Sequence, residues 1–162
     1  MNRRDKSNYY LDIAEQVSKR CTCLRRKYGA AIVKDDEIIA TGYAGAPRGR
    51  KNCSDIGSCI REEKKIARGE RYELCRSVHA EANAIISAPR RDMIGASLYL
   101  VGRDVKSGGY IENANSCAMC KRLIINAGIA SVYIRDDENN YRIVSAADWI
   151  DDDDSLSSDL GY

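Results

Sequence analysis

The sequence predicts an α/β fold, a three-layer α/β/α sandwich, because strand-like and helical patterns alternate along one chain. Residues 28–43 form two strand-like runs around Asp35-Asp36, which is the pattern of a β-hairpin. Helical patterns follow at 78–88 and 117–126, and each is succeeded by another strand-like run. Strands that alternate with helices favour a sheet covered by helices on both faces.

The chain is long enough, at 162 residues, to bury a hydrophobic core as one domain, which we place at residues 1–150. Its 44% hydrophobic and 31% charged content is typical of a globular protein in water. No run of about eighteen apolar residues occurs and no apolar leader follows Met1, so we expect no membrane span, no signal peptide and a cytoplasmic location. Residues 151–162 form an acidic tail, which we expect to be flexible.

Each element is predicted from hydrophobic spacing and from the residues that begin or end it. Ser7 is the expected N-cap of the first helix, and Ser116 is the expected N-cap of the last. The expected helices and strands are helices 7–19, 60–67, 78–88 and 117–126, and strands 28–33, 37–43, 96–101, 130–134 and 141–144. The side chains expected to face the core from helix 78–88 are Ala82, Ile85 and Ile86.

The net charge of +2 conceals an uneven distribution along the chain. Residues 1–91 carry 20 Lys and Arg against 12 Asp and Glu, whereas residues 92–162 carry 6 against 12. The basic half is able to attract a phosphate-bearing small molecule. A solvated surface explains the asymmetry better than a nucleic-acid footprint, so nucleic acid is not the expected partner.

The residues that carry chemistry are His79, Glu81, Cys117 and Cys120, and His79 is the only histidine in the chain. Zinc held by one imidazole and two thiolates keeps a fourth tetrahedral position for water. Bound zinc lowers the pKa of that water from about 15.7 to about 7. Glu81 stands too close to the histidine in sequence to share its metal comfortably, so we expect it to move protons. Both motifs begin helices, whose dipoles favour thiolates.

Blander interpretations exist for each motif taken alone. A single histidine is usually a core or surface residue, and a Cys-x-x-Cys pair is often a structural knuckle or a redox pair. A structural zinc takes a fourth protein ligand, which another of the seven cysteines could supply. Glu81 could simply favour the helix dipole. The joint occurrence of a histidine, a glutamate at +2 and a later Cys-x-x-Cys is the signature of zinc nucleobase deaminases.

Longer blocks of sequence narrow this interpretation. From Leu11 to Arg135 the chain resembles the deoxycytidylate (dCMP) deaminases, whereas free cytidine deaminases typically have a cysteine at the position of His79. The blocks that carry the resemblance are the glycine-rich loop 42–49, the pair Asn52-Cys53, residues 73–85 and residues 117–129.

The resemblance implies a cytidine-deaminase-like fold with a central mixed five-stranded sheet. It also implies that His79, Cys117 and Cys120 bind one catalytic Zn²⁺, and that Glu81 is the catalytic proton shuttle. The implied reaction is hydrolysis of dCMP to dUMP and ammonia, a step that supplies precursors of dTTP. Water attacks C4 of cytosine, and Glu81 protonates N3 and later the leaving amine.

The family further implies a homo-oligomer, either a hexamer or a smaller dimer or trimer. Regulation by dCTP and dTTP is implied at a subunit interface to which the glycine-rich loop contributes. The expected substrate or effector contacts are Gly45, Arg48, Asn52 and Ala80.

Two positions depart from the family pattern. Ser116 replaces the proline that usually precedes the first cysteine, and Ala44 replaces an asparagine that faces the sugar or base in related deaminases. Another group must therefore replace that asparagine, either Asn52 or a residue of the 102–115 loop.

A second, structural zinc is implied for the cysteine-containing insertion at residues 50–76. Some family members carry such a site. Zinc bound by four thiolates would stabilise the folded conformation of a segment that has little apolar content. The expected ligands are Cys23, Cys53, Cys59 and Cys75, with Cys21 as the alternative to Cys23. The competing interpretation is that these four residues are ordinary reduced cysteines that bind no metal.

Two other functions remain open. One is a tRNA adenosine deaminase or another nucleobase deaminase on the same fold, with dCTP also possible as a substrate. The other is a structural zinc module without catalysis, in which Glu81 would have no chemical role.

Overall fold

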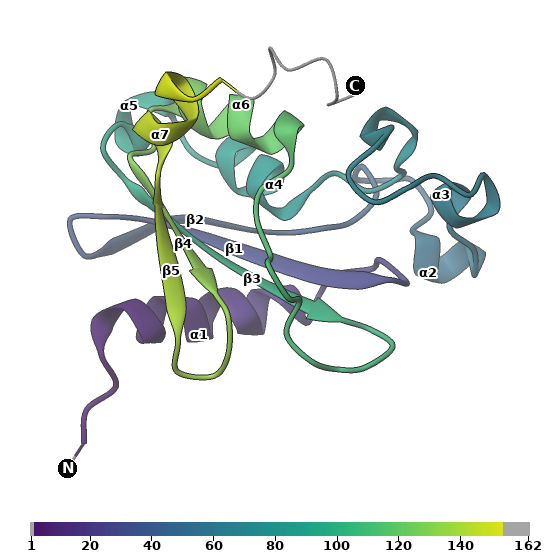
Figure 1. Ribbon diagram of the computed structural model, residues 1–162, viewed down its shortest axis with the longest axis horizontal. Coiled ribbons are helices and arrows are strands. Elements are labelled where there is room, and N and C mark those ends of the chain that lie inside the picture. Colours follow the sequence, from purple (N-terminus) through teal and green to yellow (C-terminus); the bar gives the residue numbers. More distant parts are fainter. Residues whose placement is uncertain (1, 154–162) are drawn as a thin grey trace.

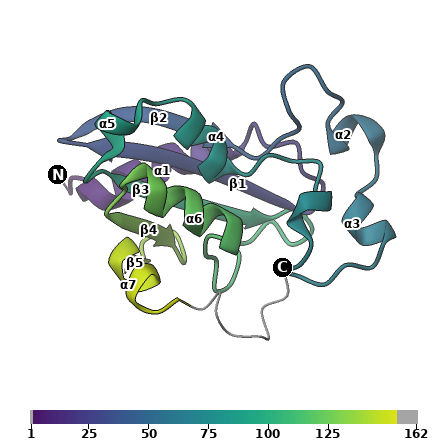
Figure 2. The same ribbon diagram turned by 90° about the horizontal axis from the view of Figure 1, so that it is seen from above.

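The computed structural model describes residues 2–153 and consists of a five-stranded sheet with helices on both faces (Figures 1 and 2). The strand order is β2-β1-β3-β4-β5. The strands are β1 (Arg26–Lys34), β2 (Glu37–Tyr43), β3 (Ser97–Asp104), β4 (Ser131–Arg135) and β5 (Tyr141–Ser145). The helices are α1 (Lys6–Ser18), α2 (Cys53–Ile56), α3 (Ile60–Glu63), the 3-10 helix η1 (Tyr72–Leu74), α4 (Ala80–Ile86), α5 (Arg90–Met93), α6 (Ala118–Ala127) and α7 (Ala146–Asp151).

The sheet is mixed, as expected. β1 pairs antiparallel with both β2 and β3, and β4 pairs antiparallel with β5. β3 and β4 are parallel, and the connection that includes α6 joins them. Asp35 and Asp36 have φ of 50° and 65°, which is the backbone of a tight hairpin turn. The three-layer α/β/α prediction is therefore confirmed.

Two hydrophobic cores lie on opposite faces of the sheet. Ala30 and Ile32 of β1 belong to the core beneath α4 and α6. Ala31 and Val33, which alternate with them, belong to the core against α1. A central strand buried on both faces reads as a continuous apolar run, which is why the sequence marks β1 clearly.

Gly42 allows α4 to lie directly against β2. A Cβ at this position would lie 2.3 Å from the carbonyl oxygen of Ala80 and 2.4 Å from the amide nitrogen of Ala84. Both atoms belong to the backbone of the helix that follows His79, so they cannot rotate away. The close packing of α4 against β2 therefore requires glycine, which has no side chain, at position 42.

Replacing Gly42 with alanine is expected to lower the free energy of unfolding by about 2–3 kcal/mol, because the methyl group forces α4 away from the sheet. Gly109→Ala is the control, because a Cβ there meets only the Ser107 hydroxyl, at 3.5 Å. Urea unfolding of both variants measures the difference. Equal stability of Gly42→Ala and the parent protein would contradict the tight packing of α4.

A buried arginine ties α1 to the sheet. Arg135, at the end of β4, is 1% exposed and pairs with Asp12 and Glu15 of α1, each at 2.8 Å. It also donates to the backbone and side-chain oxygens of Asn8 at 3.1 and 3.0 Å. Because a buried charge requires such partners, this network holds α1 in a defined position.

Both predicted serine caps were wrong. Asp5 is the N-cap of α1, and its carboxylate accepts the backbone amide of Asn8 at 3.0 Å, so the helix begins before Ser7. Cys117 is the N-cap residue of α6, which begins one residue later than expected. Ser116 therefore precedes the cap, and its buried hydroxyl makes no hydrogen bond with the described residues.

The prediction that Ile86 faces the core was also wrong. Ile86 is 72% exposed and lies in the last turn of α4, whereas Ala80 and Ala84 are fully buried. Helical spacing predicts which residues share a face, but the contacts with the sheet decide which face is covered.

A short helix extends beyond the predicted strands. In α7, which follows β5, the side chain of the N-cap Ser145 accepts the amide of Ala147 at 3.3 Å. The predicted domain boundary at residue 150 falls within this helix. Most of the expected flexible tail, residues 154–162, lies outside the described part of the chain. Within residues 2–153, no helix is long and apolar enough to cross a membrane.

Candidate active site and metal centre

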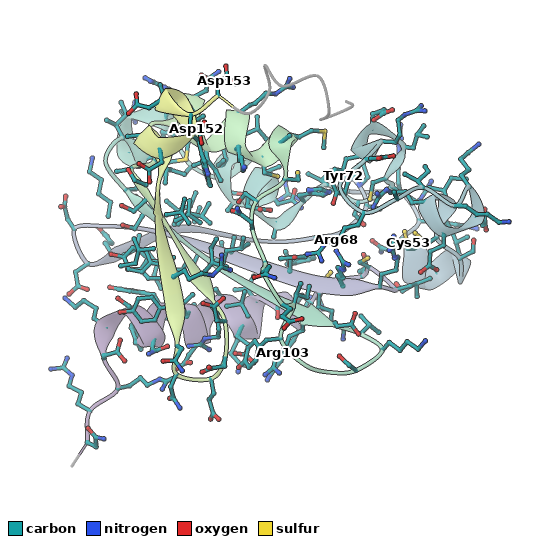
Figure 3. All side chains as sticks on the ribbon, viewed as in Figure 1. Cys53, Arg68, Tyr72, Arg103, Asp152 and Asp153 are labelled. Atoms are coloured by element: carbon teal, nitrogen blue, oxygen red, sulfur yellow. The ribbon has the colours of Figure 1, made fainter. Side chains whose placement is uncertain are left out.

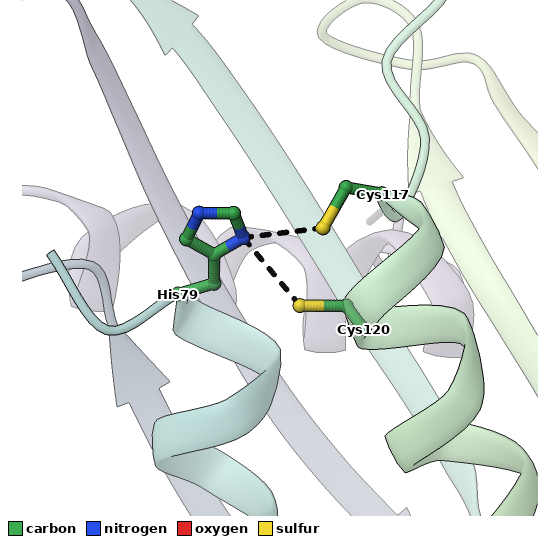
Figure 4. Close-up of side chains that lie close together, drawn as sticks. All are labelled: His79, Cys117 and Cys120. Carbon is green, nitrogen blue, oxygen red and sulfur yellow. Dashed lines mark hydrogen bonds between the residues drawn. The ribbon is translucent and has the colours of Figure 1, made fainter. Parts of the chain in front are cut away.

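The predicted ligands His79, Cys117 and Cys120 meet between the starts of two neighbouring helices (Figure 4). His79 is the N-cap residue of α4, Cys117 is the N-cap residue of α6, and Cys120 lies in the first turn of α6. His79 Nδ1 lies 3.4 Å from Cys117 Sγ and 3.5 Å from Cys120 Sγ. The two motifs are far apart in sequence and are joined because α4 and α6 pack side by side on the sheet.

The geometry of this trio fits a tetrahedral zinc ion. Zinc bonds of about 2.0–2.1 Å to nitrogen and about 2.3 Å to sulfur imply a nitrogen–sulfur edge of about 3.6 Å. The three ligand atoms lie within 4.8 Å of one another, and no other His, Cys, Asp or Glu of residues 2–153 joins the group. One imidazole and two thiols therefore leave a tetrahedral position without a protein ligand, as the catalytic interpretation requires.

Hydrogen bonds among the three side chains and their burial shift the pKa of each of them. Hydrogen bonds from Cys120 and His79 lower the pKa of Cys117 to about 4, although burial opposes the shift. Burial alone would lower the pKa of His79, but Cys117, Cys75 and Glu81 raise it to about 11. The hydrogen bond to Cys117, together with burial, raises the pKa of Cys120. A metal ion that binds here must displace these protons, so binding should release acid.

Glu81 lies in the first turn of α4 and is 4% exposed. Burial raises the pKa of its carboxyl group, and the positive charge of His79 only partly offsets this effect. Ser116 also acts to lower the pKa of Glu81, although its buried hydroxyl makes no hydrogen bond with the described residues. A buried carboxyl group with a raised pKa is suited to accept a proton and release it again.

A cavity of about 630 Å³ connects these groups with the insertion at residues 50–76. His79, Glu81 and Cys117 line it. Its size is in the range of small-molecule sites. The sequence did not single out several residues of its wall, because they come from separate segments that carry no motif. These residues include Tyr28, Arg68, Tyr72 and Trp149.

The four predicted substrate or effector contacts occupy different surroundings. Ala80 lines the cavity, and Gly45 forms a β-bridge with Val78 beside it. Arg48 is exposed and is not among the residues of the cavity wall. The side-chain oxygen of Asn52 accepts the Thr22 hydroxyl at 2.9 Å and the Ala46 amide at 3.2 Å. Asn52 thus holds the glycine-rich loop in place.

Three of the four cysteines predicted for a second zinc, Cys23, Cys59 and Cys75, line the cavity. Burial raises the pKa of Cys53, and the thiols of Cys23, Cys59 and Cys75 raise it further. Among the described residues, these sulfur atoms do not form a second group of three within 4.8 Å. Cys21 is engaged elsewhere, because its thiol donates to the Arg26 carbonyl at 3.5 Å.

Residues 4–135 match the cytidine and deoxycytidylate deaminase zinc-binding region. The chain belongs to this family. The matched segment spans α1 to β4 and contains the trio and Glu81, so the family assignment and the geometry concern the same residues.

Relatives within the family include curated deoxycytidylate deaminases. The protein of Mycobacterium phage D29 is 36% identical over 137 residues, which cover 82% of this chain and 95% of the phage protein. The protein of Schizosaccharomyces pombe is 32% identical over 125 residues, which cover 77% of this chain but 35% of the longer yeast protein.

Solved structures agree with the fold. The crystal structure of dCMP deaminase from cyanophage S-TIM5 in complex with dCMP and dUMP has a TM-score of 0.56 and 25% identity, covering 83% of this chain and 84% of that one. Cytidine deaminase from Burkholderia pseudomallei has a TM-score of 0.54 and 18% identity, covering 86% and 92%. The latter shows the shared fold alone.

Proposed function

We propose that this family member catalyses the hydrolytic deamination of dCMP to dUMP and ammonia, in the supply of dTTP precursors. The observation that carries the proposal is the open trio of His79, Cys117 and Cys120, of which His79 and Cys117 line one cavity together with the buried Glu81. The similarity to curated deoxycytidylate deaminases supports dCMP as the substrate.

In this proposal His79, Cys117 and Cys120 hold one zinc ion, which when bound makes water nucleophilic near neutral pH. Glu81 accepts a proton from the water and donates it to N3 of cytosine. Water adds to C4 as a hydroxyl group, Glu81 takes the remaining proton of that hydroxyl and passes it to the amine, and the bond between C4 and the amino nitrogen breaks to release ammonia. A carbonyl replaces the amine, and nothing is oxidised or reduced.

The test is to incubate the zinc-loaded protein separately with dCMP, dCTP, deoxycytidine and an adenosine-containing RNA, and to measure ammonia. We expect release from dCMP at a rate well above that from the other three. Release from the RNA but not from dCMP would replace the proposal with a nucleic-acid deaminase. No release from any of them, with folded and metal-bound protein, would favour a structural zinc module.

We also propose that Cys23, Cys53, Cys59 and Cys75 hold a second, structural zinc. The position of Cys23, Cys59 and Cys75 in one cavity wall supports this site, and a metal bond would draw their thiols together. Reduced, purified protein is expected to contain two zinc ions per protomer by elemental analysis. Cys59→Ser is expected to lower the ratio to one and to keep the trio. A ratio of one in the unmodified chain would exclude the second site.

Assembly as a homo-oligomer and regulation by dCTP and dTTP are part of the same proposal. Exposed apolar side chains on the helical face support self-association, including Ile86, Ile94 and Leu123. Light scattering measures the assembly, and deamination rates with added dCTP or dTTP measure regulation. The reduced cysteines that the metal sites need fit a cytoplasmic location.

A further inference from the structure

The imidazole of His79 has two edges, and the thiols of the trio contact only one of them. Cys117 and Cys120 both face Nδ1, at 3.4 and 3.5 Å, so the other ring nitrogen, Nε2, points away from the thiols (Figure 4). A metal-ligating imidazole is normally oriented by a second group that holds its far edge. The surroundings of that edge therefore decide how well His79 is held as a ligand.

The ring of Tyr72 packs against the imidazole of His79. The two ring centroids are 4.9 Å apart, and the ring planes meet at 87°. Aromatic pairs favour this perpendicular arrangement, because the positive edge of one ring meets the negative face of the other. In Figure 3, Tyr72 lies between α4 and the helices α2 and α3. The contact therefore joins the insertion at residues 50–76 to the N-cap residue of α4.

The backbone on both sides of Tyr72 is well defined. The preceding residue, Arg71, has φ of 49° and ψ of 45°, a left-handed conformation that is unfavourable for a residue other than glycine. On the other side, the amide of Cys75 donates to the carbonyl oxygen of Tyr72 at 2.9 Å and closes the turn of η1. A strained conformation persists only where surrounding contacts impose it. The position of Tyr72 is therefore imposed by its contacts.

Arg61 of α3 supplies one of these contacts. Its guanidinium carbon lies 4.4 Å from the centre of the Tyr72 ring, within the range of a cation–π interaction. Arg61 is 5% exposed, and it donates to the carbonyl oxygens of Ala67 and Glu70 at 2.8 and 2.7 Å. Its Nε has no hydrogen-bond partner in the described chain. The aromatic face of Tyr72 therefore helps to offset the cost of burying this charge.

The contacts form one continuous series from the insertion to the metal centre. Arg61 ties the backbone of the insertion together, Tyr72 packs on Arg61, and His79 packs on Tyr72. Both Arg61 and Tyr72 also line the cavity that His79 lines. The order of the insertion can thus reach the imidazole although this segment supplies no member of the trio.

We propose that Tyr72 is a positioning residue for the metal ligand His79, and that Arg61 keeps Tyr72 in place. The inference rests on the proposed function, in which His79 holds the catalytic zinc. Because Tyr72 fixes the far edge of the imidazole, Nδ1 faces the two thiols before a metal binds, and less conformational freedom is lost on binding. The folded state of the insertion thereby sets the metal affinity of the trio.

The experiment uses the fact that His79 is the only histidine of the chain. Nuclear magnetic resonance of protein labelled with ¹⁵N-histidine therefore reports this imidazole alone. For the zinc-loaded parent protein we expect a single pair of sharp ring-nitrogen signals. Tyr72→Leu, which removes the ring but keeps apolar volume, is expected to broaden or split them. A chelator titration followed by the same signals should show zinc affinity weakened about tenfold to a hundredfold, the usual effect of losing a group that orients a ligand.

Three further variants make the result specific. Tyr72→Phe keeps the ring and should hold zinc within about twofold of the parent protein. Arg61→Met keeps the apolar part of the side chain and removes the guanidinium, so affinity should fall about threefold to tenfold. Tyr9→Leu is the matched control, because Tyr9 is 51% exposed on α1, on the opposite face of the sheet from the trio. It should leave the imidazole signals unchanged.

Unchanged imidazole signals and zinc affinity in Tyr72→Leu would overturn the positioning role and leave Tyr72 as packing of the insertion only. Equal losses in Tyr72→Phe and Tyr72→Leu would also overturn it, because the hydroxyl rather than the ring would then be responsible. A loss of the same size in Tyr9→Leu would overturn it too, since the effect would not depend on contact with His79.

Thermal unfolding of each variant identifies misfolding, and a measurement on the unmodified chain avoids that problem. The ring protons of Tyr72 and His79 should exchange magnetisation through space in the metal-free protein as well as in the zinc-loaded protein. Contact only after zinc is added would contradict a ligand that is positioned in advance.

None of these measurements depends on turnover. If the parent protein does not deaminate dCMP but Tyr72→Leu loosens His79 and weakens zinc binding, the proposed reaction fails and the positioning role stands. If the parent protein deaminates dCMP and Tyr72→Leu keeps its imidazole signals and zinc affinity, the reaction stands and the positioning role fails.

Discussion

Replacing Glu81 with alanine is expected to lower kcat for dCMP by about a thousandfold to ten-thousandfold, while zinc content and fold are kept. Glu81 is the buried carboxyl group beside the trio, and it does not join the three ligand atoms. Removing it deletes the group that we propose moves protons between water, N3 and the leaving amine. The metal ligands stay in place because they come from other positions on α4 and α6.

Two further variants make the result specific. Glu81→Gln keeps the volume of the buried side chain and is expected to lose as much activity as alanine, because an amide cannot carry the proton. Glu63→Gln removes an exposed carboxylate of α3 outside the cavity and should leave kcat unchanged. Stopped-assay ammonia release gives kcat, and elemental analysis gives the zinc content. Near-parental turnover in Glu81→Ala would remove Glu81 from the mechanism.

Replacing Cys120 with serine is expected to remove the catalytic zinc ion and lower activity by about a thousandfold or more. A serine hydroxyl is a harder and weaker ligand than a thiolate, and it must lose a proton of much higher pKa. Cys120 is 1% exposed, so it also contributes to packing at the start of α6. Both the metal and part of the stability should therefore be lost together.

Cys21→Ser provides the matched comparison, since Cys21 is also a buried thiol but donates to a β1 carbonyl rather than to the trio. It should retain zinc and activity. Elemental analysis and ammonia release are measured on both variants after dialysis against a chelator. Full zinc occupancy and normal turnover in Cys120→Ser would mean that His79 and Cys117 do not need it, and the proposed centre would be wrong.

The sequence alone was sufficient for the parts of this protein that depend on local chemistry. The hairpin around Asp35-Asp36 was predicted from turn residues between apolar runs, and its strands lie where expected. The trio of His79, Cys117 and Cys120 was predicted from residue types and spacing, because the ligands of an open zinc site are few and distinctive. Both features can be recognised in the sequence, because the hairpin depends on neighbouring residues and the trio depends on rare side chains.

Tertiary structure decided which separate segments meet. Ile86 and Ala84 share one helix, yet only the contact with β2 buries Ala84 and leaves Ile86 in solvent. Tyr28 and Arg68 enter one cavity although no motif links a strand residue to an insertion residue. Periodicity describes directions within one element, whereas distances between elements depend on how helices pack on the sheet. For that reason the meeting of His79, Cys117 and Cys120 could be predicted from the sequence, and the wall of the cavity beside them could not.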